Sequence, residues 1–292
     1  MRSYSAFDAT LNEVRRIVRD SLLRTSMRDH VARFGASVGG GKMLRARLLL
    51  QVGFVSDVPR SVMCRTGAAV EMLHAASLLH DDIVDGGMRR RGQPAFWVSE
   101  GPRAAVLMGD LLVSLAVEGV HEALPTQLPM LIATLREMCD AEAEQEFSGA
   151  DTDSSWDRCV SISRRKTGSL FGFAAACAGG SQPARVEALQ RAGYALGTAY
   201  QLADDLLDAC PDPLATDKSL GTDAATGKLT AATFFPESGA DPQACIAALL
   251  QESEDGLECW PEVQQAWRKY VGDVMAPLVA SFAGSTGMQS YA

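Results

Sequence analysis

The chain has 292 residues, of which 47% are hydrophobic and 22% are charged, and its formal net charge at pH 7 is −9. This composition is typical of a globular protein with a sizeable core, and the negative charge argues against a general nucleic-acid-binding protein, because the phosphate backbone attracts basic surfaces. The seven cysteines include no Cys-x-x-Cys pair. They therefore indicate neither a disulfide framework nor a zinc site, and we expect reduced thiols in a cytoplasmic protein.

Helical periodicity recurs along the whole chain, and no convincing run of alternating strand residues is found. The first segment mixes charged and apolar residues, which is typical of an amphipathic helix and not of a signal peptide. The most apolar stretch, residues 104–124, is interrupted by Asp110, Glu118 and His121, so no transmembrane helix is predicted. The expected helices span residues 7–31, 43–55, 61–84, 103–124, 130–147, 156–179, 183–209, 243–251 and 262–282.

The breaks between these helices are rich in turn residues, and none is long enough or biased enough in composition to be a domain linker. They lie at residues 37–41, 86–94, 148–155, 211–227 and 236–242. We therefore expect a single all-α domain over residues 1–292, folded as a helical bundle. In such a bundle, sites are built from side chains on facing helices.

A glycine-rich turn, residues 39–41, precedes the second expected helix and is followed by Lys42 and Arg45. The free backbone N–H groups at a helix start attract anions, so these two cations are candidates for phosphate contacts. The turn lacks the GxxxxGK[ST] spacing of a P-loop. Taken alone, it would more often be a plain turn than a ligand site.

The third expected helix ends in an acidic cluster, Asp81-Asp82-Ile83-Val84-Asp85. Residues four apart on a helix lie about 40° apart, so Asp81 and Asp85 share a face and Asp82 points roughly 100° away. Carboxylates crowded in this way repel one another and need a cationic partner. Mg²⁺ is the natural candidate if a phosphate shares the site. His74 lies on the same face, whereas we interpret His80 as structural.

Three arginines follow this helix in the stretch Gly86-Gly87-Met88-Arg89-Arg90-Arg91-Gly92. Arginine forks match phosphate oxygens. Three arginines in a loop are most often solvated surface, but just beyond a metal-type carboxylate cluster they are better interpreted as diphosphate ligands.

A second cluster of the same form, Asp204-Asp205-Leu206-Leu207-Asp208, lies in the helix expected at residues 183–209. Gln201 shares a face with Asp205 and Asp208, within about 40°. Lys166-Thr167 precedes this helix, and Lys218 and Lys228 follow it. We expect the two acidic helices to face each other across one cavity.

These residues predict an all-α enzyme that binds Mg²⁺ and one or more diphosphates above an apolar cavity. No serine, cysteine or histidine is arranged for nucleophilic attack. Such a site can stabilise a departing diphosphate and leave a carbocation behind.

Six stretches form an ordered series from about Gly40 to Thr230: GGKMLRARL, EMLHAASLLHDDIVDGGMRRRGQP, MGDLL, KTGSLF, AYQLADDLLD and DKSLGTDAATGKLT. In order and spacing they resemble the motifs of the trans-isoprenyl (polyprenyl) diphosphate synthases. The resemblance implies an isoprenoid synthase bundle with a central active-site cavity, three Mg²⁺ ions and a homodimer. It also implies the reaction: an allylic diphosphate ionises, the isopentenyl double bond attacks the cation, and a proton is lost, so that each cycle adds one five-carbon unit in the trans sense.

The resemblance also implies a role for each matching residue. The Mg²⁺ ligands are Asp81, Asp85 and Asp204, supported by Asp82, Asp205 and Asp208. The allylic diphosphate is held by Arg90, Lys166, Thr167, Gln201, Lys218 and Lys228, and isopentenyl diphosphate by Lys42, Arg45, His74 and Arg91. Of these, Asp81, Asp85, Asp204, Lys166 and Arg90 are the catalytic group.

The chain departs from the family pattern at a few positions. Met43 stands where a second arginine is usual, Ala46 where proline is usual, and Asp217 where glycine is usual, and Thr230 is followed by Ala-Ala where Leu-Pro is common. None of the matched ligand positions is lost.

Product length depends on residues before the first acidic cluster. The family associates bulky residues there with short products, whereas Ala76 and Ser77 are small, and Leu73 or Val70 could form a floor. We therefore prefer geranylgeranyl diphosphate or a longer product, with farnesyl diphosphate as the alternative. A class I terpene cyclase and a non-catalytic subunit of a prenyl synthase are the competing classes. The primer, the pathway and the choice between homo- and hetero-oligomer stay open.

Overall fold

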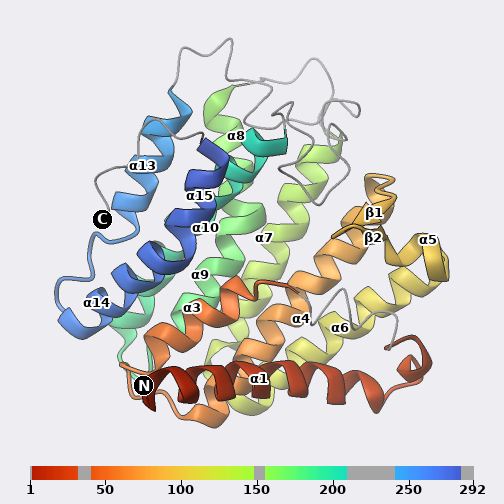
Figure 1. Ribbon diagram of the computed structural model, residues 1–292, viewed down its shortest axis with the longest axis horizontal. Helices are drawn as coiled ribbons and strands as arrows, with labels where there is room; N and C mark the ends of the chain where they lie inside the picture. The colour runs from red at the N-terminus through yellow and green to blue at the C-terminus, as the bar shows by residue number, and fades with distance from the viewer. Residues whose placement is uncertain (1, 32–40, 148–154, 209–240, 284–292) are drawn as a thin grey trace. The chain divides into compact units, whose positions relative to one another are not determined.

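The computed structural model describes residues 2–31, 41–147, 155–208 and 241–283, and nearly all of its regular elements are helices (Figure 1). The prediction of an all-α fold is thus confirmed. The described residues form two compact units, unit 1 up to Pro129 and unit 2 from Met130. A single domain over residues 1–292 stays a prediction. The expected break at residues 211–227, and most of those at 37–41, 148–155 and 236–242, lie outside the described residues.

Unit 1 is built around one long central helix, α4. Its elements are α1 (Arg2–Leu23), α3 (Leu44–Gly53), α4 (Arg60–Val84), β1 (Arg89–Arg90), β2 (Gln93–Pro94), α5 (Phe96–Glu100), α6 (Pro102–Ala123) and the 3₁₀ turn η1 (Pro125–Gln127). The helices α1, α3, α5 and α6 all contact α4. Small residues of α4, among them Gly67, Ala68 and Ala69, are buried and allow neighbouring helices to approach closely.

The amphipathic helix α1 lies across α3 and α4 (Figure 1). Its apolar face carries Leu11, Val14, Val18 and Leu22, each at most 5% exposed. Full burial of such a side chain contributes about 1.5–3 kcal/mol. This face therefore accounts for most of the stability that holds α1 in place.

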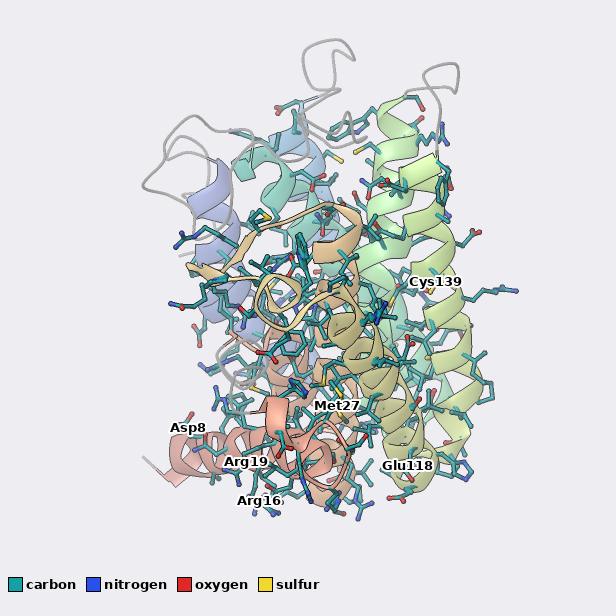
Figure 2. The ribbon with its side chains drawn as sticks, turned by 90° about the vertical axis from the view of Figure 1, so that its right-hand side faces the viewer. Asp8, Arg16, Arg19, Met27, Glu118 and Cys139 are labelled. Carbon is teal, nitrogen blue, oxygen red and sulfur yellow. The ribbon has the colours of Figure 1, made fainter. Side chains whose placement is uncertain are left out.

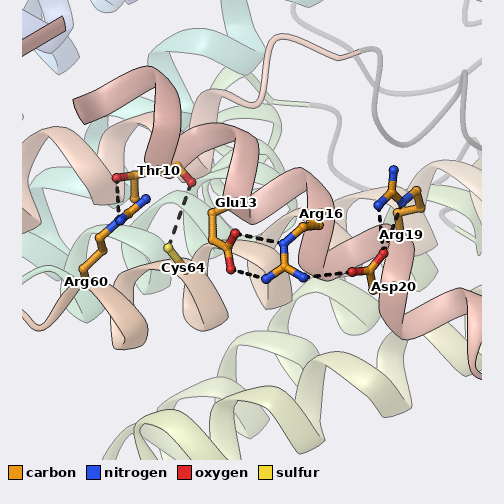
Figure 3. A network of polar contacts seen from close by, with 7 residues as sticks. All are labelled: Thr10, Glu13, Arg16, Arg19, Asp20, Arg60 and Cys64. Atoms are coloured by element: carbon orange, nitrogen blue, oxygen red, sulfur yellow. Dashed lines mark hydrogen bonds and ion pairs between the residues drawn. The ribbon is translucent and has the colours of Figure 1, made fainter. Parts of the chain in front are cut away.

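Polar side chains line the same helix (Figure 3). Arg60 of α4 donates through Nε to the buried Thr10 Oγ1 at 3.1 Å, which is a direct link between the two helices. Farther along α1, Arg16 pairs with Glu13 and Arg19 with Asp20 (Figure 3), and the side chains of both arginines are exposed. Exposed pairs of this kind contribute about 0–1 kcal/mol each.

The first expected helix, residues 7–31, differs from the structure at both ends. The helix α1 begins at Arg2 and ends at Leu23, and a turn separates it from the helical residues 28–31. The Thr25 hydroxyl donates to the Leu22 carbonyl at 2.7 Å and accepts the Met27 N–H at 3.2 Å. A hydroxyl that replaces backbone partners in this way competes with the helix.

The helix α6 has the length and composition of a membrane span, with a mean hydropathy of 1.5 over its most apolar window. Length and composition alone are weak evidence, and α6 packs along α4. A Cβ atom at Gly109 would lie 2.2 Å from Nε2 of His80, so the two helices meet closely there. Asp110 and Glu118 are exposed, and Glu118 points from α6 into solvent (Figure 2). The helix α6 is therefore a packed element of unit 1 and not a membrane span.

Unit 2 is organised around α10. Its elements are α7 (Leu128–Phe147), α8 (Trp156–Ser163), the π-helical turn η2 (Arg164–Gly168), α9 (Ser169–Cys177), α10 (Pro183–Asp208), α13 (Pro242–Glu252), α14 (Pro261–Tyr270), a second π-helical turn η3 (Val271–Met275) and α15 (Ala276–Ala283). The elements α8, η2, α9, α13 and α15 contact α10. The two π turns interrupt helices that the periodicity predicts as regular.

Glycines bring η2 and α9 into backbone contact with α10. A Cβ atom at Gly193 would lie 2.5 Å from the Phe171 carbonyl oxygen, and one at Gly197 would lie 2.8 Å from Cα of Gly168. A side chain has no room at either position. This glycine seam sets how closely the residues before α9 approach the acidic end of α10.

Candidate active site

The first acidic cluster lies at the C-terminal end of α4, where the burial pattern separates its members. Asp81 and Asp85 are half-buried, as is His74 two turns earlier, whereas Asp82 is 5% exposed. The spacing of seven and four residues places His74, Asp81 and Asp85 along one face, which agrees with the arrangement expected from the sequence.

Asp82 is bound by Arg90. The Arg90 Nε lies 3.1 Å from Asp82 Oδ1, and Nη2 lies 2.5 Å from the same oxygen. The backbone N–H of Gly87 donates to the Asp82 carbonyl at 2.9 Å, and the Trp97 indole donates to the Gly87 carbonyl at 2.8 Å. These bonds fix the chain that leads from α4 to the arginines.

The arginine loop is a two-residue β-hairpin in which Arg89 pairs with Pro94 and Arg90 with Gln93. Arg91 and Gly92 form its turn with φ values of 53° and 72°. Positive φ at both central residues is typical of the type I′ hairpin turn, whose twist matches the strands. Arg90 therefore lies in strand β1, whereas Arg91 lies in the turn that follows it.

Arg91 extends to the glycine-rich turn before α3. A Cβ atom at Gly41 would lie 2.6 Å from Arg91 Nη2, so the guanidinium lies directly against this turn. Next to it, Lys42 is exposed and Arg45 is 7% exposed. The structure therefore brings together three of the four residues that the sequence assigns to isopentenyl diphosphate.

Sequence reasoning missed Glu71 of α4, whose Oε1 accepts the backbone N–H of Ala46 at 2.9 Å. Burial raises the pKa of Glu71, whereas the Ala46 hydrogen bond and the charges of Arg45 and Arg91 lower it. The one signal in the sequence is a lone carboxylate in an apolar stretch of helix, because such a group is buried only with partners.

In unit 2, the π turn η2 carries Lys166 and Thr167. Lys166 forms an ion pair with Glu142 and donates to Gln145 Oε1 at 3.0 Å, both on α7. Sequence reasoning missed these two partners, because the spacing of a single segment holds no information about a neighbouring helix.

Thr167 starts a chain of hydrogen bonds that ends at the second acidic cluster. Its hydroxyl donates to Gln201 Oε1 at 2.7 Å, and Gln201 Nε2 donates to Asp205 Oδ1 at 2.7 Å. Asp205 is 7% exposed and Asp204 is half-buried. The structure thus joins Thr167, Gln201 and Asp205 as the sequence suggests. Lys218, Lys228 and the side chain of Asp208 lie outside the described residues.

A second ion-pair group lies on α7 beside this network. Glu144 pairs with Arg165, and Arg158 Nε donates to Glu144 Oε1 at 2.9 Å. The hydrogen bonds from Arg165 and Arg158 hold the pKa of Glu144 below its ordinary value.

The residues predicted to set product length differ in burial. Ala76 is 1% and Leu73 is 2% exposed, whereas Ser77 is half-buried and its hydroxyl donates to the His74 carbonyl at 2.9 Å. Ser77 therefore lies nearer than Ala76 to the less buried face of α4 that carries Asp81.

Carboxylate oxygens are the donors that Mg²⁺ prefers, and the half-buried Asp81, Asp85 and Asp204 offer them. Within the described ranges, no three histidine, cysteine, aspartate or glutamate side chains converge to hold a metal ion. The oxygen chemistry of these aspartates fits Mg²⁺, which is usually bound through one or two carboxylates together with water and substrate phosphates.

Comparisons with known proteins agree with these observations. The model of the family described as Polyprenyl synthetase matches residues 32–266. The chain is 32% identical over 241 residues to the short chain isoprenyl diphosphate synthase of Methanothermobacter thermautotrophicus, covering 79% of this chain and 72% of that protein. It is 30% identical over 259 residues to the nonaprenyl diphosphate synthase of Mycobacterium tuberculosis, covering 86% and 73%. Among solved structures, the polyprenyl synthase of Caulobacter crescentus, complexed with calcium and isoprenyl diphosphate, matches with a TM-score of 0.70 and 25% identity over 96% of this chain and 95% of that one.

Proposed function

The chain belongs to the polyprenyl synthetase family, and from this premise we propose that it condenses isopentenyl diphosphate with an allylic diphosphate to give an all-trans polyprenyl diphosphate, geranylgeranyl diphosphate or longer. Its relatives are prenyl diphosphate synthases that make products of different lengths, so the chain is a transferase of this class. Farnesyl diphosphate is the alternative product.

The observation that carries this proposal is a feature common to both units: a cation or hydroxyl from a neighbouring segment lies beside an acidic helix end. In unit 1, Arg90 binds Asp82. In unit 2, Thr167 is linked through Gln201 to Asp205. Diphosphate binding with Mg²⁺ needs this combination, because the carboxylates hold the metal and the donors hold the phosphate oxygens.

We assign the chemistry to these residues as follows. Arg90, Lys166 and Thr167 hold the allylic diphosphate while its carbon–oxygen bond breaks and the electron pair leaves with the diphosphate. The two aspartate clusters would hold Mg²⁺, which would supply positive charge to stabilise this leaving group. The double bond of isopentenyl diphosphate then attacks the cation, and the proton lost from the adduct passes to the released diphosphate.

The remaining residues take the roles expected from the sequence. We assign Mg²⁺ binding to Asp81, Asp82, Asp85, Asp204, Asp205 and Asp208. Gln201, Lys218 and Lys228 complete the allylic diphosphate site, and Lys42, Arg45, His74 and Arg91 form the isopentenyl diphosphate site. The proposal includes a homodimer that works in the cytoplasm with three Mg²⁺ ions per active site.

The test is an incubation with labelled isopentenyl diphosphate, Mg²⁺ and each of dimethylallyl, geranyl and farnesyl diphosphate, followed by chromatography of the dephosphorylated products. We expect labelled all-trans alcohols that are longer than farnesol. Accumulation of farnesol would favour the alternative product. A cyclic hydrocarbon formed without label would indicate a terpene cyclase, and no product with any primer would indicate a non-catalytic subunit.

A further inference from the structure

The start of α3 depends on a side chain from another helix. Its N-cap residue, Met43, makes no side-chain capping bond. The N–H of Ala46, in the first turn, belongs to the group of donors that have no partner within a helix. It donates instead to Glu71 Oε1 of α4 at 2.9 Å. Glu71 thus caps α3 at the point where Lys42 and Arg45 lie.

The carboxylate of Glu71 is also a negatively charged partner for the arginines around it. Glu71 is 6% and Arg45 is 7% exposed, so both charges are screened little by water. Burial raises the pKa of Glu71, and the charges of Arg45, Arg91 and Arg15 act against that rise by stabilising the ionised form. A buried arginine is retained only beside such a partner.

Two residues near Glu71 and its arginine partners have a strained backbone conformation. In the described ranges, the non-glycine residues with positive φ are Met43, Asp57 and Arg91. Met43 starts α3, and Arg91 forms the hairpin turn beside Gly41. A left-handed conformation costs a residue with a side chain about 1–2 kcal/mol, and such strain persists only where the surroundings enforce it. At Met43 the Ala46–Glu71 hydrogen bond lies in the helical turn that follows, and at Arg91 the hairpin turn itself favours a positive φ.

We propose that Glu71 is a positioning residue that holds Arg45 and Arg91 in the orientation that binds the diphosphate of isopentenyl diphosphate. This inference rests on the proposed function. Glu71 does not touch the substrate. It acts through two separable contacts, the hydrogen bond from Ala46 and the charge interaction with the two arginines.

Two substitutions separate these contacts. Glu71→Gln keeps an oxygen that accepts the Ala46 N–H but removes the charge. Ala46→Pro removes the N–H but keeps the charge, and proline is tolerated in a first helical turn. Glu254→Gln is the matched control, because Glu254 is 8% exposed and bound to Arg268 at 2.8 Å in unit 2.

The experiment is a steady-state measurement of KM for isopentenyl diphosphate and for the allylic substrate separately. In Glu71→Gln we expect KM for isopentenyl diphosphate to rise on the order of tenfold, the loss expected for one charge-assisted contact. KM for the allylic substrate should change less than about twofold, because the substitution weakens a site that binds only isopentenyl diphosphate. Ala46→Pro, which introduces the residue usual in the family, should change KM for isopentenyl diphosphate less than about twofold, because Glu71 keeps its charge. Glu254→Gln should leave both KM values unchanged.

An unchanged KM for isopentenyl diphosphate in Glu71→Gln, or an equal rise for both substrates, would overturn the proposal and leave Glu71 a purely structural group. If Glu71→Gln is too unstable to assay, Glu71→Asp takes its place, because it keeps the charge but moves the carboxylate away from its partners, and an unchanged KM for isopentenyl diphosphate in Glu71→Asp has the same meaning. Failure of the proposed function has a different signature: the wild type then shows no condensation. In that case hydrogen exchange at the Ala46 amide decides, because it should be slow in the wild type and faster in Glu71→Ala, and equal rates would reject the positioning role.

Discussion

Arg90 and Asp82 are bound to each other, although the sequence assigns one to a diphosphate site and the other to a metal site. Two nitrogens of the guanidinium contact Asp82 Oδ1, and the Asp82 side chain is 6% exposed against 21% for Arg90. An arginine has more donors than this contact uses. The pair therefore orients Arg90 and leaves donors for a phosphate.

Asp82 and Arg90 should contribute jointly to the free energy of unfolding, so that the effects of replacing them are not additive. We expect Asp82→Asn to lower the free energy of unfolding by about 2 kcal/mol, because the partly buried Arg90 loses a charged acceptor. Urea denaturation of Asp82→Asn, Arg90→Gln and the double variant measures the coupling. Strictly additive losses would show that the contact contributes no interaction energy.

Removal of a proposed Mg²⁺ ligand should abolish turnover and preserve the fold. Asp81 and Asp204 are half-buried at helix ends, so Asp81→Ala or Asp204→Ala relieves like-charge repulsion and opens no cavity in the core. We expect kcat to fall by several orders of magnitude, with each factor of ten equal to about 1.4 kcal/mol of barrier. The measurement is turnover against Mg²⁺ concentration, with circular dichroism as the check on folding. Near-normal condensation in either variant would contradict the role of both clusters.

Ser77→Phe should shorten the product. Ser77 is half-buried on the less buried side of α4, about one turn before Asp81, so a phenylalanine there should meet the growing chain. Catalysis should persist, because no proposed ligand is changed. The product distribution at matched substrate ratio is the measurement, and an unchanged distribution would place the floor elsewhere, for example at Leu73.

Ala76→Phe should shorten the product as well, but at a loss of stability. Ala76 is 1% exposed and packed in the core of unit 1. Overpacking such a position costs about 1–3 kcal/mol. We therefore expect a lower denaturation midpoint for Ala76→Phe than for Ser77→Phe, and equal midpoints would show that α4 has free space on both sides.

The ion pairs of Glu144 should make the free energy of unfolding depend on pH in the acidic range. Arg165 and Arg158 lower the pKa of Glu144 from its ordinary value of 4.5. Because the folded state holds its proton less tightly than the unfolded state, the stabilisation is present above pH 4.5 and is lost as the pH falls through the lowered value. Its size should be about 1 kcal/mol or less, since the group is partly exposed. Urea midpoints measured across this range should vary less with pH in Glu144→Gln than in the wild type.

Periodicity predicted the helices well where a regular apolar face exists. The expected helix at residues 61–84 differs from α4 by one residue at its start. The first expected helix starts later than α1 and runs past its end, where the hydroxyl of Thr25 bonds to the backbone. The two π turns were not predicted, because they keep the local composition of a helix and differ only in their hydrogen bonds.

At the candidate site too, some residues follow from spacing in the sequence and others are found only in the structure. Spacing within one segment identified the clustered aspartates, and the hydrogen bonds from Thr167 to Gln201 and Asp205 agree with it. Glu71 and Gln145 were missed, because each reaches a predicted site residue or its helix from a different element. Contacts of this kind arise only from packing, which a single sequence does not encode at any fixed spacing.

The π turn at Arg164–Gly168 holds one residue more than a turn of α-helix, because its bonds run from i to i+5. Loss of one residue there would let α8 and α9 join as one regular helix, and the two flanking helices would keep their phase. The residues inside the turn would change position, and these include Lys166 and Thr167. Their contacts with Gln145 and Gln201 depend on the wide turn. This segment should therefore tolerate substitutions far better than changes in length.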